Sequence, residues 1–280
     1  MKALQGHHLK AVGTVRNYEQ ALTRVAEYVK AERLPHGLRG LTPAQALSYL
    51  EKRGQDVGQK TLDMERQAIQ SMFHHVTGQL APDERLTVVK SAHQQVLTSR
   101  GYTPAQIHLI VDAQTTRNAL ATELAYAAGL RAHELYTLQP AHERPAHVRP
   151  ALDSKWQGRD GVLYTVHGKG GLVRHVLIPL PLAERLKTHR LATPQSVTDR
   201  GIHYQQHYAI NGGHRWSSAF TSASQRVLGW SAGAHGLRHT YAQERMHELQ
   251  RQGLTRIHAL ETVSQEMGHF RPDITETYLR

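Results

Sequence analysis

The sequence contains no cysteine among its 280 residues. Disulfide bonds, thiolate zinc sites and cysteine nucleophiles are therefore excluded, and the absence fits a reducing compartment. Long apolar runs are also lacking, because no window approaches 18 consecutive apolar residues and the first twenty residues hold no apolar stretch of signal-peptide length. We therefore expect a cytoplasmic protein that does not span a membrane. A chain of this length can bury sizeable cores without a structural metal.

Basic residues outnumber acidic ones. Lys and Arg total 34 against 23 Asp and Glu, which gives a net charge of +11 with histidine neutral. Such an excess favours a polyanionic partner, most commonly nucleic acid, whose affinity falls with salt. We expect phosphate contacts at a basic surface from Arg174, Arg215, Arg226, Arg245 and Arg256.

The N-terminal third reads as short amphipathic helices. Apolar residues follow one helical face between Val15 and Val29 and again between residues 62 and 76. Between these segments, Thr42 and Gln45 form a capping box with proline at the first helical position. The polar stretch 81–85 resembles a linker. The pattern predicts a small helical domain over residues 1–85.

The remaining residues, 86–280, read as one mixed domain. Thr103 and Gln106 repeat the capping box, and a further helix is expected from Thr116 to Gly129. Residues 162–166 and 172–179 form the one clear strand pair, joined by a glycine-rich turn.

From Trp216 onward the pattern is helical, with breaks at three glycines and a last short helix capped by Asp273 and Glu276. Trp216 and Trp230 are expected in the core. The fold class is therefore mainly α with a small antiparallel β-sheet (α+β), in two domains.

Four short strings carry the residues suited to chemistry. They are 128–135 (AGLRAHEL), the turn with Lys169, 235–241 (HGLRHTY), and Met267-Gly268-His269 with Tyr278 nine residues later. In this order and spacing they resemble the catalytic domain of the tyrosine recombinases, the phage-integrase family. The resemblance covers about residues 115–280, and by position and pattern the N-terminal helices resemble the family's core-binding (SAM-like) domain. Residue by residue, it implies a catalytic set of Arg131, Lys169, His235, Arg238, His269 and Tyr278.

The implied reaction breaks and rejoins DNA through a 3′-phosphotyrosyl bond on Tyr278, without metal, ATP or another cofactor. Arg131 and Arg238 would clamp the nonbridging phosphate oxygens with permanently charged forks.

A tyrosine hydroxyl is a weak nucleophile at neutral pH and needs a base. His235 would be that base, while Lys169 would protonate the leaving 5′ oxygen. His269 would donate one more hydrogen bond, and Glu134 would orient Arg131.

The resemblance also implies partners. These are double-stranded DNA and further copies of the chain, as a dimer on each core site and a tetramer at synapsis. Accessory DNA-bending proteins are allowed, and mobile elements or phages of bacteria are the implied carriers. The chain ends at Arg280, two residues after Tyr278, and has little room for an N-terminal arm-binding module. Both departures from the family concern regulation and accessory-site binding.

Three other functions stay open. A non-cutting DNA-binding relative would lack the covalent adduct, and a type IB topoisomerase would relax plasmids without a special site. A metal hydrolase is suggested by the histidine pairs His203 with His207 and His235 with His239, whose spacing places both rings on one helical face. No H-E-x-x-H string accompanies them.

Overall fold

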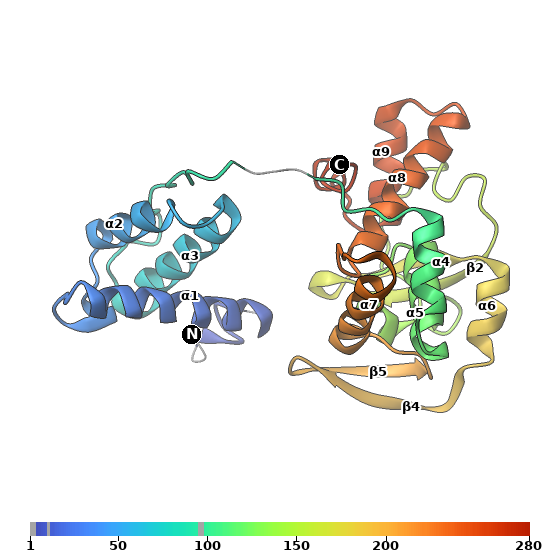
Figure 1. Cartoon of the computed structure of the whole chain (residues 1–280), viewed down its shortest axis with the longest axis horizontal. Helices are drawn as coiled ribbons and strands as arrows, with labels where there is room; N and C mark the ends of the chain where they lie inside the picture. The colour runs from blue at the N-terminus through green and yellow to red at the C-terminus, as the bar shows by residue number, and fades with distance from the viewer. Residues whose placement is uncertain (1–3, 10–11, 95–97) are drawn as a thin grey trace. The chain divides into compact units, whose positions relative to one another are not determined.

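The structure is a computed structural model that describes residues 4–9, 12–94 and 98–280, with the backbone but not the side chain of Lys169. The chain forms two compact units, Met1–Leu97 and Thr98–Arg280 (Figure 1). Across the described ranges, no helix combines the length and the apolar character required to cross a bilayer.

The first unit is helical, as its periodicity predicts. Its helices are α1 (Val12–Ala31), α2 (Pro43–Arg53) and α3 (Gln59–Met72), with a 3-10 turn at Gly37–Gly40 and a π-helical turn at Phe73–Thr77. The apolar stripe of α1 is buried in the core of this unit. The capping box on α2 is confirmed: Gln45 N donates to Thr42 Oγ1 at 3.3 Å, and Thr42 N donates to Gln45 Oε1 at 3.0 Å.

The segment 86–94, which the sequence assigns to the second domain, packs against this first unit. Leu86 is buried in the helical core. Ser91 N donates to Gln59 Oε1 at 2.9 Å, and Ser91 Oγ donates to Val57 O at 2.6 Å. The composition of a polar segment does not reveal these long-range hydrogen bonds, so the compact unit extends beyond the expected linker.

The second unit combines helices with two small sheets, as the sequence predicts in outline. Its helices are α4 (Pro104–Asp112), α5 (Thr116–Ala127), α6 (Leu180–Lys187), α7 (Gly213–Leu228), α8 (Gly236–Arg251), α9 (Arg256–Glu266) and α10 (Pro272–Glu276), with 3-10 turns η4 (Glu134–Thr137) and η5 (Lys169–Gly171). Its strands are β1 (Gln139–Pro140), β2 (Val162–His167), β3 (Val173–Ile178), β4 (Arg190–Asp199) and β5 (Ile202–Tyr208).

Strands β1, β2 and β3 form an antiparallel sheet in that order, and the register pairs Tyr164 with Val176. This confirms the strand pair expected around the glycine-rich turn. The second sheet is an antiparallel ribbon of β4 and β5 (Figure 1). The sequence does not predict this ribbon, because β4 is largely exposed and polar and lacks an apolar–polar alternation.

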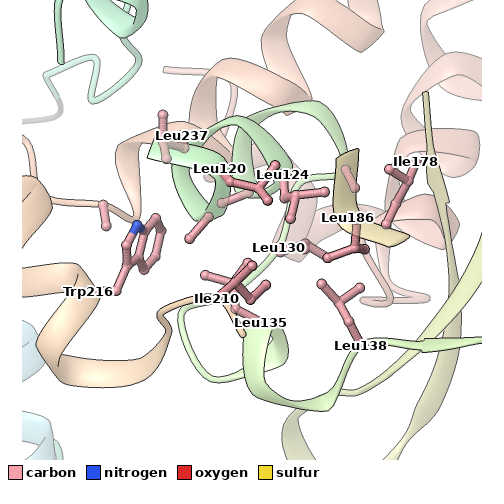
Figure 2. Packing of buried hydrophobic residues seen from close by; sticks show 14 of the residues in the cluster. Leu120, Leu124, Leu130, Leu135, Leu138, Ile178, Leu186, Ile210, Trp216 and Leu237 are labelled. Carbon is pink, nitrogen blue, oxygen red and sulfur yellow. The ribbon is translucent and has the colours of Figure 1, made fainter. Parts of the chain in front are cut away.

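Helices α5 and α7 and the three-stranded sheet enclose the main core (Figure 2). Trp216 of α7 is fully buried, and its Nε1 donates to Thr122 Oγ1 of α5 at 3.1 Å. The expectation for Trp230 is wrong, because its side chain is 41 % exposed and stacks on Tyr102 with 5.2 Å between ring centroids.

The C-terminal helices pack into a further apolar cluster that includes Tyr278. Helix α10 begins after Arg271 without a side-chain cap, so the expected capping box of Asp273 and Glu276 is wrong. Glu276 instead pairs with Arg256 of α9, at 2.7 Å.

Candidate active site

Four separate segments supply the expected site residues. Arg131 lies between α5 and η4, and Lys169 lies in η5 between β2 and β3. The side chain of Lys169 falls outside the described part of the structure. His235 is the N-cap of α8 and Arg238 lies three residues later, where the helical repeat brings both onto one face.

Near the C-terminus, His269 follows α9 and Tyr278 follows α10. The chain leaves α9 through Gly268 at φ 72°, and a Cβ at this position would collide with the side chain of Arg174. Glycine is therefore required here by both the backbone angle and the close approach of that arginine.

These segments converge on Tyr278. Its ring centroid lies 5.4 Å from that of His235 and 5.0 Å from that of His269, and the Cζ atom of Arg238 lies 5.6 Å from it. Tyr278 is only 9 % exposed. The nucleophile, both histidines and the second arginine of the expected set therefore occupy one pocket.

Arg238 is a fully buried cation. It donates through Nη1 to Gly129 O, and through Nη2 to Met267 O and to His269 Nε2, each of the latter at 3.0 Å. Its Nε has no hydrogen-bond partner among the described atoms. Burial, followed by the charge of Arg131, lowers the pKa of Arg238 to about 9, so the side chain stays protonated at neutral pH. None of the described carboxylates forms an ion pair with Arg238, and Glu134 acts on its charge only at longer range.

The two expected histidines are neutral. Burial and the nearby Arg238 lower the pKa of His235 to about 4 and that of His269 to about 3. Because a guanidinium only donates, Nε2 of His269 accepts from Arg238. The ring proton is thereby assigned to Nδ1, which lies 2.9 Å from Thr275 Oγ1. A neutral His235 beside the tyrosine has the protonation state of a base.

Arg131 is held by Glu134. The carboxylate accepts from Arg131 Nη1 and from the Arg131 backbone N–H, both at 2.8 Å. Burial alone would raise the pKa of Glu134, but the surrounding guanidinium groups of Arg174, Arg238 and Arg131 outweigh it and hold the pKa well below its ordinary value. Glu134 is thus a buried anion that fixes the first arginine, as the sequence suggests.

Arg174 links three parts of the pocket. It lies on β3, donates to Glu134 Oε2 at 2.8 Å and donates to Glu266 O, at the end of α9, at 2.8 Å. Its side chain also crosses Gly268, next to His269. One arginine therefore ties the strand that follows the Lys169 turn to the segments that carry Arg131 and His269.

Two of the arginines expected at a DNA surface are buried instead. Arg174 is 4 % exposed, and Arg245 is 0 % exposed in an ion pair with Glu266 at 3.0 Å. Arg256 is exposed but paired with Glu276, whereas Arg215 and Arg226 are exposed. The sequence shows where positive charge occurs but not which arginines meet buried carboxylates.

His239 also lies at the site, although the sequence did not predict a role for it in the reaction. It is 7 % exposed, and its ring centroid lies 4.7 Å from that of Tyr278. Burial, followed by the charge of Arg100, lowers its pKa to about 4. The spacing of one helical turn between His235 and His239 is the sequence feature that could have indicated this position.

The helical geometry that the metal hypothesis assumes holds for His235 and His239, which lie one turn apart at the start of α8, but not for the other pair. His203 and His207 lie on strand β5, where four residues span about 13 Å, too far for one ion. Among described side chains, no group of three His, Asp or Glu is placed to hold a metal ion.

No protein-family model matches the sequence, and no curated protein is significantly similar to it. Solved structures of tyrosine recombinases are similar in fold. The XerH site-specific recombinase in a post-cleavage complex with palindromic difH substrate is 16 % identical, with a TM-score of 0.61 over 95 % of this chain and 76 % of that chain.

A lambda integrase tetramer bound to a Holliday junction is 17 % identical, with a TM-score of 0.60 over 100 % of this chain and 74 % of that chain. The Tn1549 transposon integrase in complex with transposon right-end DNA is 13 % identical, with a TM-score of 0.57 over 100 % and 92 % of the two chains. The chain therefore has the fold of the tyrosine recombinases.

Proposed function

We propose that this chain is a site-specific DNA strand transferase that cuts and rejoins duplex DNA through a covalent bond to Tyr278. The observation that carries the proposal is the convergence of Tyr278 with a buried, unpaired Arg238 and the neutral His235 and His269. A buried cation without a carboxylate is stabilised by an incoming anion, and the scissile phosphate is such an anion.

In the proposed cleavage step, Tyr278 Oη attacks phosphorus and the bond to the 5′ oxygen breaks. The phenol proton passes to His235, and Lys169 gives a proton to the leaving 5′ oxygen. Arg131 and Arg238 neutralise the charge that builds on the nonbridging oxygens. The product is a 3′-phosphotyrosyl ester and a free 5′ hydroxyl.

Rejoining reverses these transfers. A 5′ hydroxyl attacks the phosphotyrosyl ester, and Tyr278 regains its proton as it leaves. The ester conserves the energy of the phosphodiester, so rejoining needs no ATP, and the cationic side chains of Arg131 and Arg238 supply the electrostatic stabilisation that a metal would otherwise give.

The proposed partners are duplex DNA and further copies of the chain. Lambda integrase has been crystallised as a dimer on a COC′ core site and as a tetramer on a Holliday junction. We propose the same assemblies here, with the first unit, Met1–Leu97, as the core-binding domain and the second unit, Thr98–Arg280, as the catalytic domain.

The test is capture of the covalent intermediate. Wild-type protein and Tyr278→Phe are incubated in EDTA with nicked suicide substrates made from DNA of the native genomic neighbourhood, and adducts are resolved on denaturing gels. We expect an adduct with the wild type and none with Tyr278→Phe. Salt-sensitive binding without any adduct would instead indicate a non-cutting relative, and relaxation of plasmids without a special site would indicate a topoisomerase.

A further inference from the structure

The β4–β5 ribbon carries a strained arginine at its tip. Asp199 pairs with Ile202, so the turn consists of Arg200 and Gly201 alone, with φ of 51° and 77°. Two-residue turns with positive φ at both positions favour Asn, Asp or Gly at the first of them. A long side chain there is uncommon and costs stability, which points to a use for the arginine.

The ribbon tip is fixed against α7. The Asp199 carboxylate accepts from His214 N at 3.2 Å, and Arg200 Nη2 lies 2.7 Å from His214 Nδ1. Asp199 is the one carboxylate in the stretch from Arg190 to Tyr208, and this contact directs it into the first turn of α7. No second carboxylate in this stretch would repel a phosphate.

Three exposed residues at the turn and the start of α7 form what we call the ribbon-tip patch: Arg200, His214 and Arg215. His203 pairs with Thr198 across the ribbon, and both are exposed. The neighbouring pair, Val197 with Tyr204, is more buried, and the Tyr204 ring lies 5.5 Å from that of Tyr136 in η4. One face of the ribbon therefore packs on the unit while the other is open to a partner.

The patch lies beside the segment that carries Arg131. Gly213 N, at the start of α7, donates to Ala132 O at 2.7 Å, and Tyr136 Oη donates to Gly212 O at 2.8 Å. His214 is thus one residue from a direct hydrogen bond to the neighbour of Arg131. Successive phosphates of a strand rise by about 3.4 Å along the duplex, so DNA with one phosphate at Arg131 presents others nearby.

We propose that the ribbon-tip patch binds backbone phosphates of duplex DNA next to the cleavage site, with Arg200 and Arg215 as the principal contacts. The proposal rests on the proposed function for the identity of the ligand. It explains why a turn that favours asparagine carries an arginine: the side chain supplies a phosphate contact at the expense of turn stability.

The test measures DNA binding by fluorescence anisotropy in the Tyr278→Phe background, with a fixed duplex, between about 50 and 200 mM salt. We expect Arg200→Gln and Arg215→Gln each to weaken binding severalfold at the lower salt and to reduce the slope of log affinity against log salt by about 1. Arg251→Gln, at the end of α8, removes the same charge from an exposed arginine to which no DNA contact is assigned, and should leave the slope unchanged.

A second variant separates folding from binding. Arg200→Asn relieves the backbone strain, so we expect its Tm to rise by about 2–4 °C while its DNA affinity falls as in Arg200→Gln. Unchanged slopes in the two patch variants, or an equal loss in Arg251→Gln, would overturn the proposal. Patch-dependent binding by a protein that forms no adduct would instead defeat the proposed strand transfer and leave the patch standing.

Discussion

Helix α8 carries two fully buried arginines in opposite electrostatic surroundings. Arg245 is enclosed by carboxylates, with Glu266 at 3.0 Å and Glu248 at 2.9 Å. Arg238, two turns earlier, meets two carbonyls and a neutral histidine, and its Nε lacks a partner among the described atoms. The same side chain on the same helix is therefore structural at one position and poised for a ligand at the other.

The difference follows from what burial does to a charge. Placing a cation in a protein interior costs several kcal/mol unless a counter-charge compensates. Glu266 supplies that compensation for Arg245, whereas Arg238 has its pKa lowered to about 9 and relies on Glu134 at longer range. We interpret the uncompensated charge as the part of the pocket that binds the scissile phosphate.

The largest expected effect is a loss of stability when the buried ion pair of Arg245 and Glu266 is broken. Arg245→Met leaves Glu266 buried without its main partner and should lower the free energy of unfolding by about 3–5 kcal/mol. Urea denaturation followed by circular dichroism measures this change. Arg251→Met, at the exposed end of the same helix, serves as the control and should shift stability little. A loss below about 1 kcal/mol would mean that the pair does not stabilise the fold.

Arg238→Met should slow the reaction more than it lowers stability, the reverse of what we expect for Arg245→Met. We expect the rate of adduct formation to fall by about 10²–10³ because one phosphate contact is lost from a water-poor pocket. Stability should fall less than in Arg245→Met, because the variant leaves carbonyls rather than a carboxylate without a partner. Single-turnover kinetics on the suicide substrate, alongside denaturation, give both numbers. A variant that unfolds as readily as Arg245→Met yet still forms the adduct would contradict the contrast.

Arg174→Lys tests whether Arg174 positions Arg131 and His269. Lysine keeps the charge near Glu134 but loses the fork that reaches both Glu134 and Glu266 O. Because Arg131 and His269 would then be less well positioned, we expect adduct formation to slow about ten- to a hundredfold. DNA affinity should stay near that of wild type, and an equal loss of affinity and rate would argue against a positioning role.

The smallest effect concerns pH and the histidines around Tyr278. The pKa of His239 is about 4 in the fold and lies near 6.5 in an unfolded chain, so the unfolded state binds more protons between these values. Through His239 alone, stability should change little above pH 6.5 and should fall by about 1–2 kcal/mol as the pH drops to 5, and the lowered pKa values of His235 and His269 should add losses of similar size. His239→Gln should flatten this part of the curve in pH-dependent denaturation, and an unchanged curve would show that His239 is not the titrating group.

Several structural features could be predicted from local sequence. The capping boxes at Thr42 and Thr103 form as predicted, because their hydrogen bonds join residues only three positions apart. The sheet around the Lys169 turn follows from two segments rich in β-branched and aromatic residues on either side of a glycine-rich turn. The spacing of His235 and Arg238 gives their shared helical face before any tertiary contact is known.

The features that could not be predicted depend on residues far apart in the chain. Local sequence does not show that Arg174 and Arg238 are buried, because the residues that hold them lie 40 and 31 positions away, respectively. The β4–β5 ribbon lacks an apolar alternation in its first strand, because β4 is exposed along most of its length and buries few apolar side chains. His239 becomes a neighbour of Tyr278 only when α10 packs back on α8.

The sequence by itself determined the helices, the main sheet and the residue types available for phosphate chemistry, because these depend on hydrogen bonds and periodicity over a few residues. Tertiary structure alone decided which charges are compensated, which arginines remain at the surface and which rings surround Tyr278. The physical reason is that the free energy of a charge is set by burial and by its neighbours in space, and folding brings those neighbours from distant parts of the chain.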